Sequence, residues 1–253
     1  MILCAVVMSS SRSRHPFSSI PMELVFTVDH TFTSTPQTAS RRANNAPVMT
    51  TPEQNLTPRN AFAGLSVKST EGQGVVLCER DTLGLATVLV RKARYEALAQ
   101  RVREHLHIDL PAGPYRAAAG EIALLGTGPG AWLATQEQGG NALATSLREK
   151  IGDLASISDQ SDGYAVLRLS GSKVLDTLAK LVPLDVHPRA FPVGTVAATV
   201  AAHIGATLWR LNDTANGSPV FEIAIFRSLA ADFWQALAES TAEFGLVVTR
   251  CSD

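Results

Sequence analysis

The chain has 253 residues, of which 45% are hydrophobic and 18% charged, and its formal net charge is −1 at pH 7. This composition is that of an ordinary globular chain of one or two domains. It has no basic patch interleaved with aromatic residues, so nucleic acid is not an expected partner, and no apolar run is long enough to span a membrane.

The cysteines are few and far apart. Cys4, Cys78 and Cys251 are odd in number and widely spaced. This pattern predicts reduced thiols in a reducing, cytoplasmic compartment, because a disulfide framework or a metal site would need paired or closely spaced cysteines.

Residues 1–58 differ from the rest of the chain. They are rich in Ser, Thr, Pro, Asn and Arg and show no sustained hydrophobic period, so they cannot bury enough apolar area to offset the entropy of ordering. We expect a disordered leader, with a transit peptide and an over-long start as the two explanations. In the second explanation Met49, not Met1, is the true first residue. The folded domain is expected over residues 59–253.

The first strand and helix unit is expected over about residues 75–160. Short apolar runs predict strands at 75–79, 83–91, 121–125 and 131–135. Two helices follow from apolar residues at a period of 3.6. Their apolar faces are Tyr95, Leu98, Ala99, Val102 and Leu106 in one helix, and Leu143, Leu147, Ile151 and Leu154 in the other.

The second unit, about residues 161–250, repeats this pattern. Strands are predicted at 164–169, 196–202, 206–211 and 220–226. A helix with Leu178 on its buried face runs from the turn at Gly171 to Pro183, and another has Leu229, Phe233, Leu237 and Ala238 on one face. Two successive strand and helix units predict an α+β sandwich with mostly antiparallel sheet.

The loop at residues 183–194 is stiffened by three prolines, each of which fixes its own φ angle. We expect a rigid shelf that displays four side chains, and we predict that it is a partner-binding surface, since arginine and aromatic residues dominate interface energetics. The alternative is that its phenylalanine fills the core of the chain itself. The four residues are Asp185, His187, Arg189 and Phe191.

Two patterns resemble cofactor or metal sites without their structural context. The glycines at 126–130 could form a dinucleotide-binding turn, but the sequence after them predicts a strand where the phosphate would need a helix N-terminus. His105 and His107 are two residues apart, so on a helix they point in different directions and cannot share a metal ion. We expect a plain turn and surface histidines.

A catalytic interpretation is also weak. Asp185 could orient His187, and His187 could act as the general base for a nucleophile among Ser161, Ser170 and Ser172. However, the sequence has no GxSxG motif that would strain a serine into place. Arg168 within an apolar strand is most simply an exposed position, with an interface salt bridge as the alternative. The tryptophans at 132, 209 and 234 are expected in the core.

Six segments occur in the order in which a known family has them. The chain resembles the gamma subunit of heterotetrameric bacterial sarcosine oxidases over roughly residues 60–245. Departures include Val182 in place of a cysteine and Val193 in place of a small or prolyl residue. The segments are GPGAWL (128–133), DQSDG (159–163), LRLSG (167–171), PLDVHPRAFPVG (183–194), LWRL (208–211) and RSLAADFW (227–234).

The resemblance implies a fold and a role. The fold would be a truncated relative of the folate-binding aminomethyltransferase of the glycine cleavage system. The chain would be a non-catalytic gamma subunit of a complex that demethylates sarcosine to glycine, with formaldehyde or methylenetetrahydrofolate and hydrogen peroxide as products. FAD, FMN, NAD and zinc would lie on the alpha, beta and delta subunits. This chain would then have no catalytic, cofactor-binding or metal-binding residue.

The alternative is a free-standing folate-binding or aminomethyltransferase-like protein. A full aminomethyltransferase is a three-part chain considerably longer than this one, and its catalytic acid motif has no match here. The sequence therefore favours the subunit.

Overall fold

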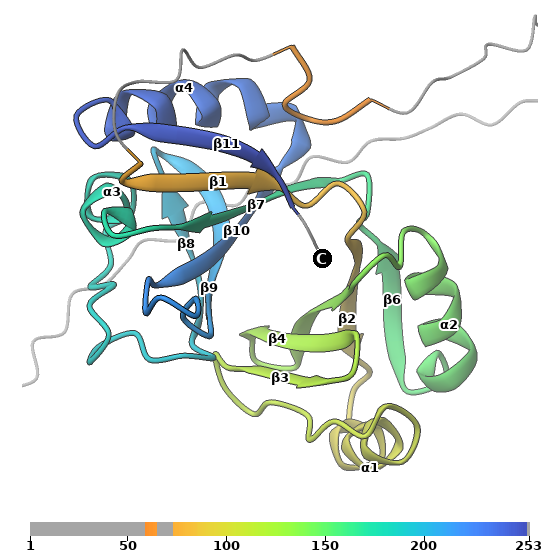
Figure 1. Cartoon of the computed structure of the whole chain (residues 1–253). Helices are drawn as coiled ribbons and strands as arrows, with labels where there is room; N and C mark the ends of the chain where they lie inside the picture. The colour runs from red at the N-terminus through yellow and green to blue at the C-terminus, as the bar shows by residue number, and fades with distance from the viewer. Residues whose placement is uncertain (1–58, 65–72, 252–253) are drawn as a thin grey trace, which may run out of the picture. The chain divides into compact units, whose positions relative to one another are not determined.

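A computed structural model describes residues 59–64 and 73–251 of the chain. Within these residues the chain forms two β-sheets, each with two α-helices packed on one of its faces (Figure 1). The predicted leader, the choice between Met1 and Met49, and Cys4 lie outside the described residues. None of the described helices is long and apolar enough to cross a membrane.

The five-stranded sheet is built from one continuous stretch of the chain. Its strand order is β3-β4-β5-β2-β6, and all its neighbouring strands are antiparallel. The helices α1 (Tyr95–Leu106) and α2 (Ala142–Ile151) cover one face with the apolar stripes expected from their 3.6 period. The strands are β2 (Gly84–Val90), β3 (Arg116–Ala119), β4 (Ile122–Gly128), β5 (Ala131–Gln136) and β6 (Ala155–Asp159).

The six-stranded sheet has the order β11-β1-β7-β10-β9-β8. Only β1 and β11 are parallel, and the other pairs are antiparallel. The helices α3 (Val174–Leu181) and α4 (Ala230–Thr241) cover one face, α4 after the short 3₁₀ turn η1 (Arg227–Leu229). The strands are β1 (Val75–Glu79), β7 (Tyr164–Ser170), β8 (Val196–Ala201), β9 (Ile204–Leu211), β10 (Val220–Phe226) and β11 (Leu246–Arg250).

Strand β1 does not stay with the strands that follow it. It lies between β7 and β11 in the six-stranded sheet, although it precedes the whole five-stranded sheet in sequence (Figure 1). Strand β1, which the sequence places in the first predicted unit, thus pairs with strands of the second.

The two sheets contact each other through the faces that their helices leave uncovered. Side chains alternate across a strand, so each strand supplies one set of residues to the helices and another to the opposite sheet. The contact between the sheets is a small apolar cluster. It comprises Leu83, Leu85, Leu125, Leu133, Val166, Val196, Trp209 and Ala224.

Most predicted elements are present. Strand β10 has the predicted bounds, Leu178 is fully buried in α3, and the three tryptophans are buried. Strands β3, β6 and β11 were not predicted from the sequence. Leu154, which was expected in a helix, instead follows the end of α2 at Ile151 and packs beneath it just before β6.

Candidate functional site

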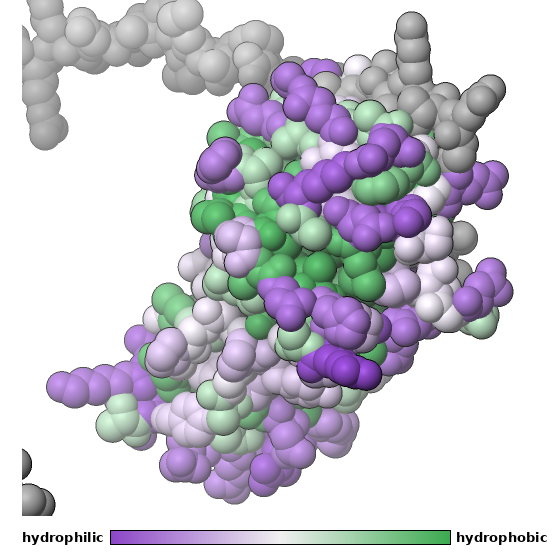
Figure 2. Space-filling view, turned by 90° about the vertical axis from the view of Figure 1, so that its left-hand side faces the viewer, coloured by the Kyte–Doolittle hydropathy of each residue, from purple (hydrophilic) through white to green (hydrophobic). Residues whose placement is uncertain are grey.

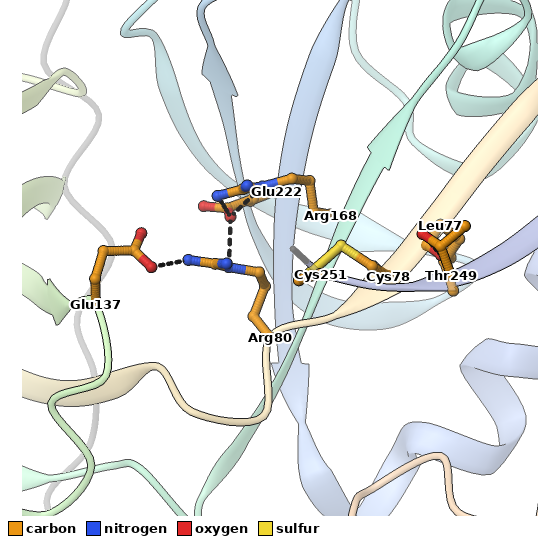
Figure 3. Close-up of a disulfide and its surroundings, with 8 residues drawn as sticks. All are labelled: Leu77, Cys78, Arg80, Glu137, Arg168, Glu222, Thr249 and Cys251. Atoms are coloured by element: carbon orange, nitrogen blue, oxygen red, sulfur yellow. Dashed lines mark hydrogen bonds and ion pairs between the residues drawn. A yellow bond between two sulfur atoms is a disulfide. The ribbon is translucent and has the colours of Figure 1, made fainter. Parts of the chain in front are cut away.

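A buried carboxylate lies between the two sheets and is surrounded by donors. Glu222 on β10 is only 4% exposed. Its Oε1 accepts a hydrogen bond of 2.9 Å from Nε of Arg168, and its Oε2 accepts one of 2.8 Å from Nε1 of Trp209. Arg80, just after β1, forms an ion pair with the same Oε1 at 3.2 Å and donates to Glu137 of the other sheet (Figure 3). A buried charge needs such partners to offset its desolvation.

Strand register brings this cluster together. Arg168 on β7 and Trp209 on β9 both stand directly opposite Glu222, one on each neighbouring strand. Opposite-charge pairs across neighbouring strands stabilise a sheet. The contacts are therefore fixed by the pairing of β7, β10 and β9 and do not depend on a flexible loop.

The prediction for Arg168 was wrong. The expectation was an exposed position, with an interface salt bridge as the alternative, but the side chain is partly buried and pairs with Glu222 of its own chain. Glu222 itself was missed. One acid within VFEIAIF and one arginine within AVLRLS are the signal that could have identified the pair, because a lone charge in a buried strand requires a partner.

A cavity with a volume of about 600 Å³ is lined by Arg168 and by residues of both sheets. Burial lowers the pKa of the Arg116 guanidinium below its ordinary value, while the charges of Glu222 and Glu137 act in the opposite direction. No acidic side chain of the described residues lines this cavity. Its polar lining includes Tyr115, Arg116, Arg168, Ser170, Asn212 and Thr214.

Two cysteines form a disulfide, contrary to the prediction of reduced thiols. Cys78 in β1 is bonded to Cys251, and their Cα atoms are 5.3 Å apart although 173 positions separate them in sequence. The parallel pairing of β1 with β11 sets Thr249 opposite Cys78, which brings the following residues alongside β1 (Figure 3). Spacing along the chain gives no hint of this contact. The cytoplasmic location, which we predicted from reduced cysteines, loses that support.

The loop at 183–194 holds its shape through short-range hydrogen bonds as well as prolines. Oδ1 of Asp185 accepts the backbone N–H of His187 at 2.9 Å, and Nδ1 of His187 accepts the backbone N–H of Arg189 at 3.3 Å. All three side chains are exposed. Asp185 therefore contacts the backbone of His187 and not its imidazole, which does not support the orienter and base arrangement.

Phe191 does not lie on the surface of this loop as we expected. Its ring is 5% exposed and packs against Phe221, with the two ring centroids 6.0 Å apart. The backbone carbonyl of Phe191 also accepts a hydrogen bond of 3.1 Å from Arg210. Phe191 therefore packs in the core of this chain, which is the alternative that the sequence left open. Its buried ring holds the loop against the six-stranded sheet.

Ser161, one of the three serines considered as nucleophiles, has a structural role. Oγ of Ser161 accepts the backbone N–H of Leu85 at 3.1 Å and lies 2.8 Å from Oδ1 of Asp159. These contacts tie the turn before β7 to β2. In the part of the chain that the structure describes, no histidine hydrogen-bonds to Ser161.

The remaining sequence motifs agree with their simpler interpretation. Residues 128–131 form the hairpin turn between β4 and β5, so no helix N-terminus follows the glycines. His105 and His107 are both exposed at the end of α1. Among the residues that the structure describes, no group of three or more His, Cys, Asp or Glu side chains is arranged to hold a metal ion.

The sequence model described as "Sarcosine oxidase, gamma subunit family" matches residues 91–243, which is more than half of the chain. The chain belongs to this family. The matched region extends from the end of β2 to the end of α4 and includes the loop at 183–194, Glu222 and Arg168.

Curated relatives and solved structures agree. The chain is 35% identical to the sarcosine oxidase subunit gamma of an Arthrobacter species over 40% of this chain and 50% of that protein. It is 38% identical to the subunit gamma of Corynebacterium sp. strain P-1 over 36% of this chain and 45% of that protein. The matched segments thus span about half the length of these relatives.

The fold has two informative neighbours. A chain of the heterotetrameric sarcosine oxidase from Corynebacterium sp. U-96 superposes with a TM-score of 0.63 at 25% identity, covering 74% of this chain and 96% of that one. Aminomethyltransferase T from Bartonella henselae has a TM-score of 0.52 at 14% identity, covering 70% of this chain and 48% of that one. The predicted α+β relationship to a truncated aminomethyltransferase fold is confirmed.

Proposed function

We propose that this chain is a non-catalytic subunit of a sarcosine oxidase complex that demethylates sarcosine to glycine, with formaldehyde or methylenetetrahydrofolate and hydrogen peroxide as products. One observation carries the proposal. A gamma subunit family sequence adopts a fold that covers 96% of a chain from a heterotetrameric sarcosine oxidase.

In this proposal the oxidation takes place on other subunits, which carry FAD, FMN, NAD and zinc. Two observations are consistent with this division: Arg168 and Trp209 donate to the two carboxylate oxygens of Glu222, and the glycine segment is a hairpin turn. The isolated chain is therefore expected to be colourless and to release no peroxide from sarcosine. Visible absorbance and a peroxide assay check this, and a stoichiometric flavin spectrum on the isolated chain would contradict it.

The partner-binding surface in this proposal is the loop at 183–194 with the strand that follows it. Asp185, His187 and Arg189 are exposed on a backbone that is already ordered, so little conformational entropy is lost on binding. Val193 at the end of the same loop and Val200 in β8 also expose apolar side chains. On the side where α3 and β8 lie in Figure 1, the surface has an apolar area at its centre with polar residues around it (Figure 2). Such an area is typical of interaction sites.

Co-expression with the alpha, beta and delta subunits, followed by size-exclusion chromatography, tests the assembly. Arg189→Ala should weaken association by about 2 kcal/mol, or roughly thirtyfold, if this arginine is an interface hot spot. The melting temperature of the free variant should stay near that of the wild type, because the side chain of Arg189 is exposed.

Arg94→Ala is the matched control, since Arg94 is also exposed but lies at the start of α1 on the five-stranded sheet. Equal affinities of both variants and the wild type would refute the loop as the interface. Failure of the wild-type chain to associate with the other subunits would refute the proposed function itself.

The free-standing alternative has one observation in its favour. A segment of 92 residues is 36% identical to an aminomethyltransferase of Saccharopolyspora erythraea, although it covers only 24% of that protein. Tight binding of tetrahydrofolate by the isolated chain, without association with other subunits, would favour this alternative.

A further inference from the structure

The charges between the two sheets do not balance. Among the described residues, the acids that form ion pairs with Arg80 or Arg168 are Glu137 and Glu222, and the same two acids act on the charge of Arg116. Three arginines against two glutamates leave one positive charge without compensation. Arg116 is partly buried, so water solvates its charge less well than on an open surface and a counter-charge that reaches it is favourable.

The arginine of this group without a direct side-chain partner among the described residues is Arg116. Arg80 pairs with both glutamates and Arg168 pairs with Glu222. The guanidinium of Arg116, by contrast, makes no hydrogen bond or ion pair with any described residue. It lines the cavity of about 600 Å³ together with Arg168 and with Arg210, which is paired with Asp213. Burial lowers the pKa of Arg116, so the site already disfavours its charge.

The cavity walls indicate what kind of counter-ion fits. Leu211, Val193 and Val220 contribute apolar surface, and Tyr115 at the edge is half exposed. Ser170 and Thr214 contribute hydroxyl groups. The space is far larger than a bare ion needs, since one water molecule occupies only about 30 Å³ in the liquid.

We propose that this cavity binds a carboxylate group borne on an apolar body, held by Arg116 with Arg168 beside it. A single uncompensated charge matches a monoanion better than a doubly charged phosphate. The planar guanidinium donates two parallel hydrogen bonds to a carboxylate, which lysine cannot do. The carboxylate comes either from a free small molecule or from an acidic side chain of a partner subunit, and the two sources can be told apart.

The first experiment uses the full chain alone and therefore does not depend on the proposed function. Benzoate is titrated by calorimetry, with benzamide as the uncharged compound of the same shape. Benzoate should bind at least about tenfold more tightly than benzamide, and Arg116→Gln should weaken benzoate binding at least about tenfold, because a charge-assisted hydrogen bond is lost. Arg94→Gln removes the same charge from an exposed arginine away from the cavity and should leave binding unchanged.

A stability measurement separates a binding role from a structural one. If the charge of Arg116 awaits a ligand, Arg116→Gln should leave the melting temperature of the free chain equal to or above that of the wild type. Benzoate should raise the melting temperature of the wild type and of Arg94→Gln but not of Arg116→Gln. A lowered melting temperature for Arg116→Gln would show that Arg116 stabilises the fold, and it would overturn the proposal.

The second experiment uses the assembled complex and rests on the proposed function. If a partner side chain supplies the carboxylate, benzoate should not bind the complex, and Arg116→Gln should weaken assembly about tenfold or more. If the source is a free molecule, the complex should bind benzoate and Arg116→Gln should assemble normally. Both results support the carboxylate site. Equal affinities of the free chain for benzoate and benzamide, with assembly unaffected by Arg116→Gln, would overturn it.

Discussion

The two faces of the six-stranded sheet use the same strands in different ways. Leu167 and Leu169 of β7 face α3 and α4, in a core of apolar side chains, whereas Arg168 between them faces the other sheet and pairs with Glu222. On β10, Phe221 and Ile223 belong to the same helix-covered core. Neighbouring residues on one strand thus belong to an apolar core on one face and to a cluster of charges on the other. The helix-covered face supplies stability through burial, and the inter-sheet face depends on exact pairing.

The largest effect is expected on the inter-sheet face. Glu222→Gln removes the acid that Arg80 and Arg168 share, and breaking such a buried ion pair costs about 3–5 kcal/mol. Chemical denaturation of the variant and the wild type measures this change in the free energy of unfolding. Glu239→Gln on the exposed side of α4 is the control and should change it by less than about 0.5 kcal/mol. Equal losses in both variants would show that the inter-sheet charges do not stabilise the fold.

A comparable but smaller effect is expected on the helix-covered face. Leu178 in α3 is fully buried against the six-stranded sheet, so Leu178→Ala should leave a cavity and lower the free energy of unfolding by about 2–5 kcal/mol. Ala179→Gly is a control on the exposed side of the same helix and should cost roughly 1 kcal/mol through helix propensity. If Leu178→Ala cost no more than its control, the burial of this face would not be the main source of stability.

The smallest effect concerns pH and a carboxylate of β1. Burial raises the pKa of Glu79 above its ordinary value of 4.5, although backbone N–H groups of Ala61 and Phe62 act in the opposite direction. The folded state then holds a proton that the unfolded state has lost. Stability from this group is present below pH 4.5 and is lost as the pH rises through the raised value.

Glu79→Gln should therefore make the melting temperature less dependent on pH in that window, since the amide can still accept the hydrogen bond of 2.8 Å from the N–H of Ala61. Melting curves from pH 4 to about pH 7 compare the variant with the wild type. Parallel curves for the two proteins would mean that Glu79 does not titrate differently in the folded state.

Local patterns predicted the elements with strong signals. The run VFEIAIF predicted the bounds of β10 correctly because β-branched and aromatic side chains dominate it, and in the structure six of its residues are buried. The helix faces followed from the 3.6 period. Strand β3 is only RAAA and β6 is ASISD, and neither has an apolar run, so pairing with neighbouring strands decides their conformation and the local sequence does not.

The candidate site could be predicted only in part, because it is made of contacts between distant strands. Glu222 meets Arg168 and Trp209 through the register of three strands, and no spacing along the chain encodes that register. The disulfide was missed for the same reason. Phe191 lies in a loop whose side chains at Asp185, His187 and Arg189 are exposed, yet its own ring packs inward against Phe221. Nothing in the local sequence distinguishes such a buried ring from an exposed one.

The position of β1 has a consequence for how the chain acquires its structure. The five-stranded sheet is continuous in sequence from β2 to β6 and can pair as soon as these strands have been made. Strand β1 precedes them but lies between β7 and β11, so its contacts have a large sequence separation and form late. During synthesis β1 must stay unpaired on at least one edge until residues 246–250 leave the ribosome. The six-stranded sheet is therefore complete only when β11 has been synthesised and pairs with β1, and Cys78 can form its disulfide with Cys251 only after that.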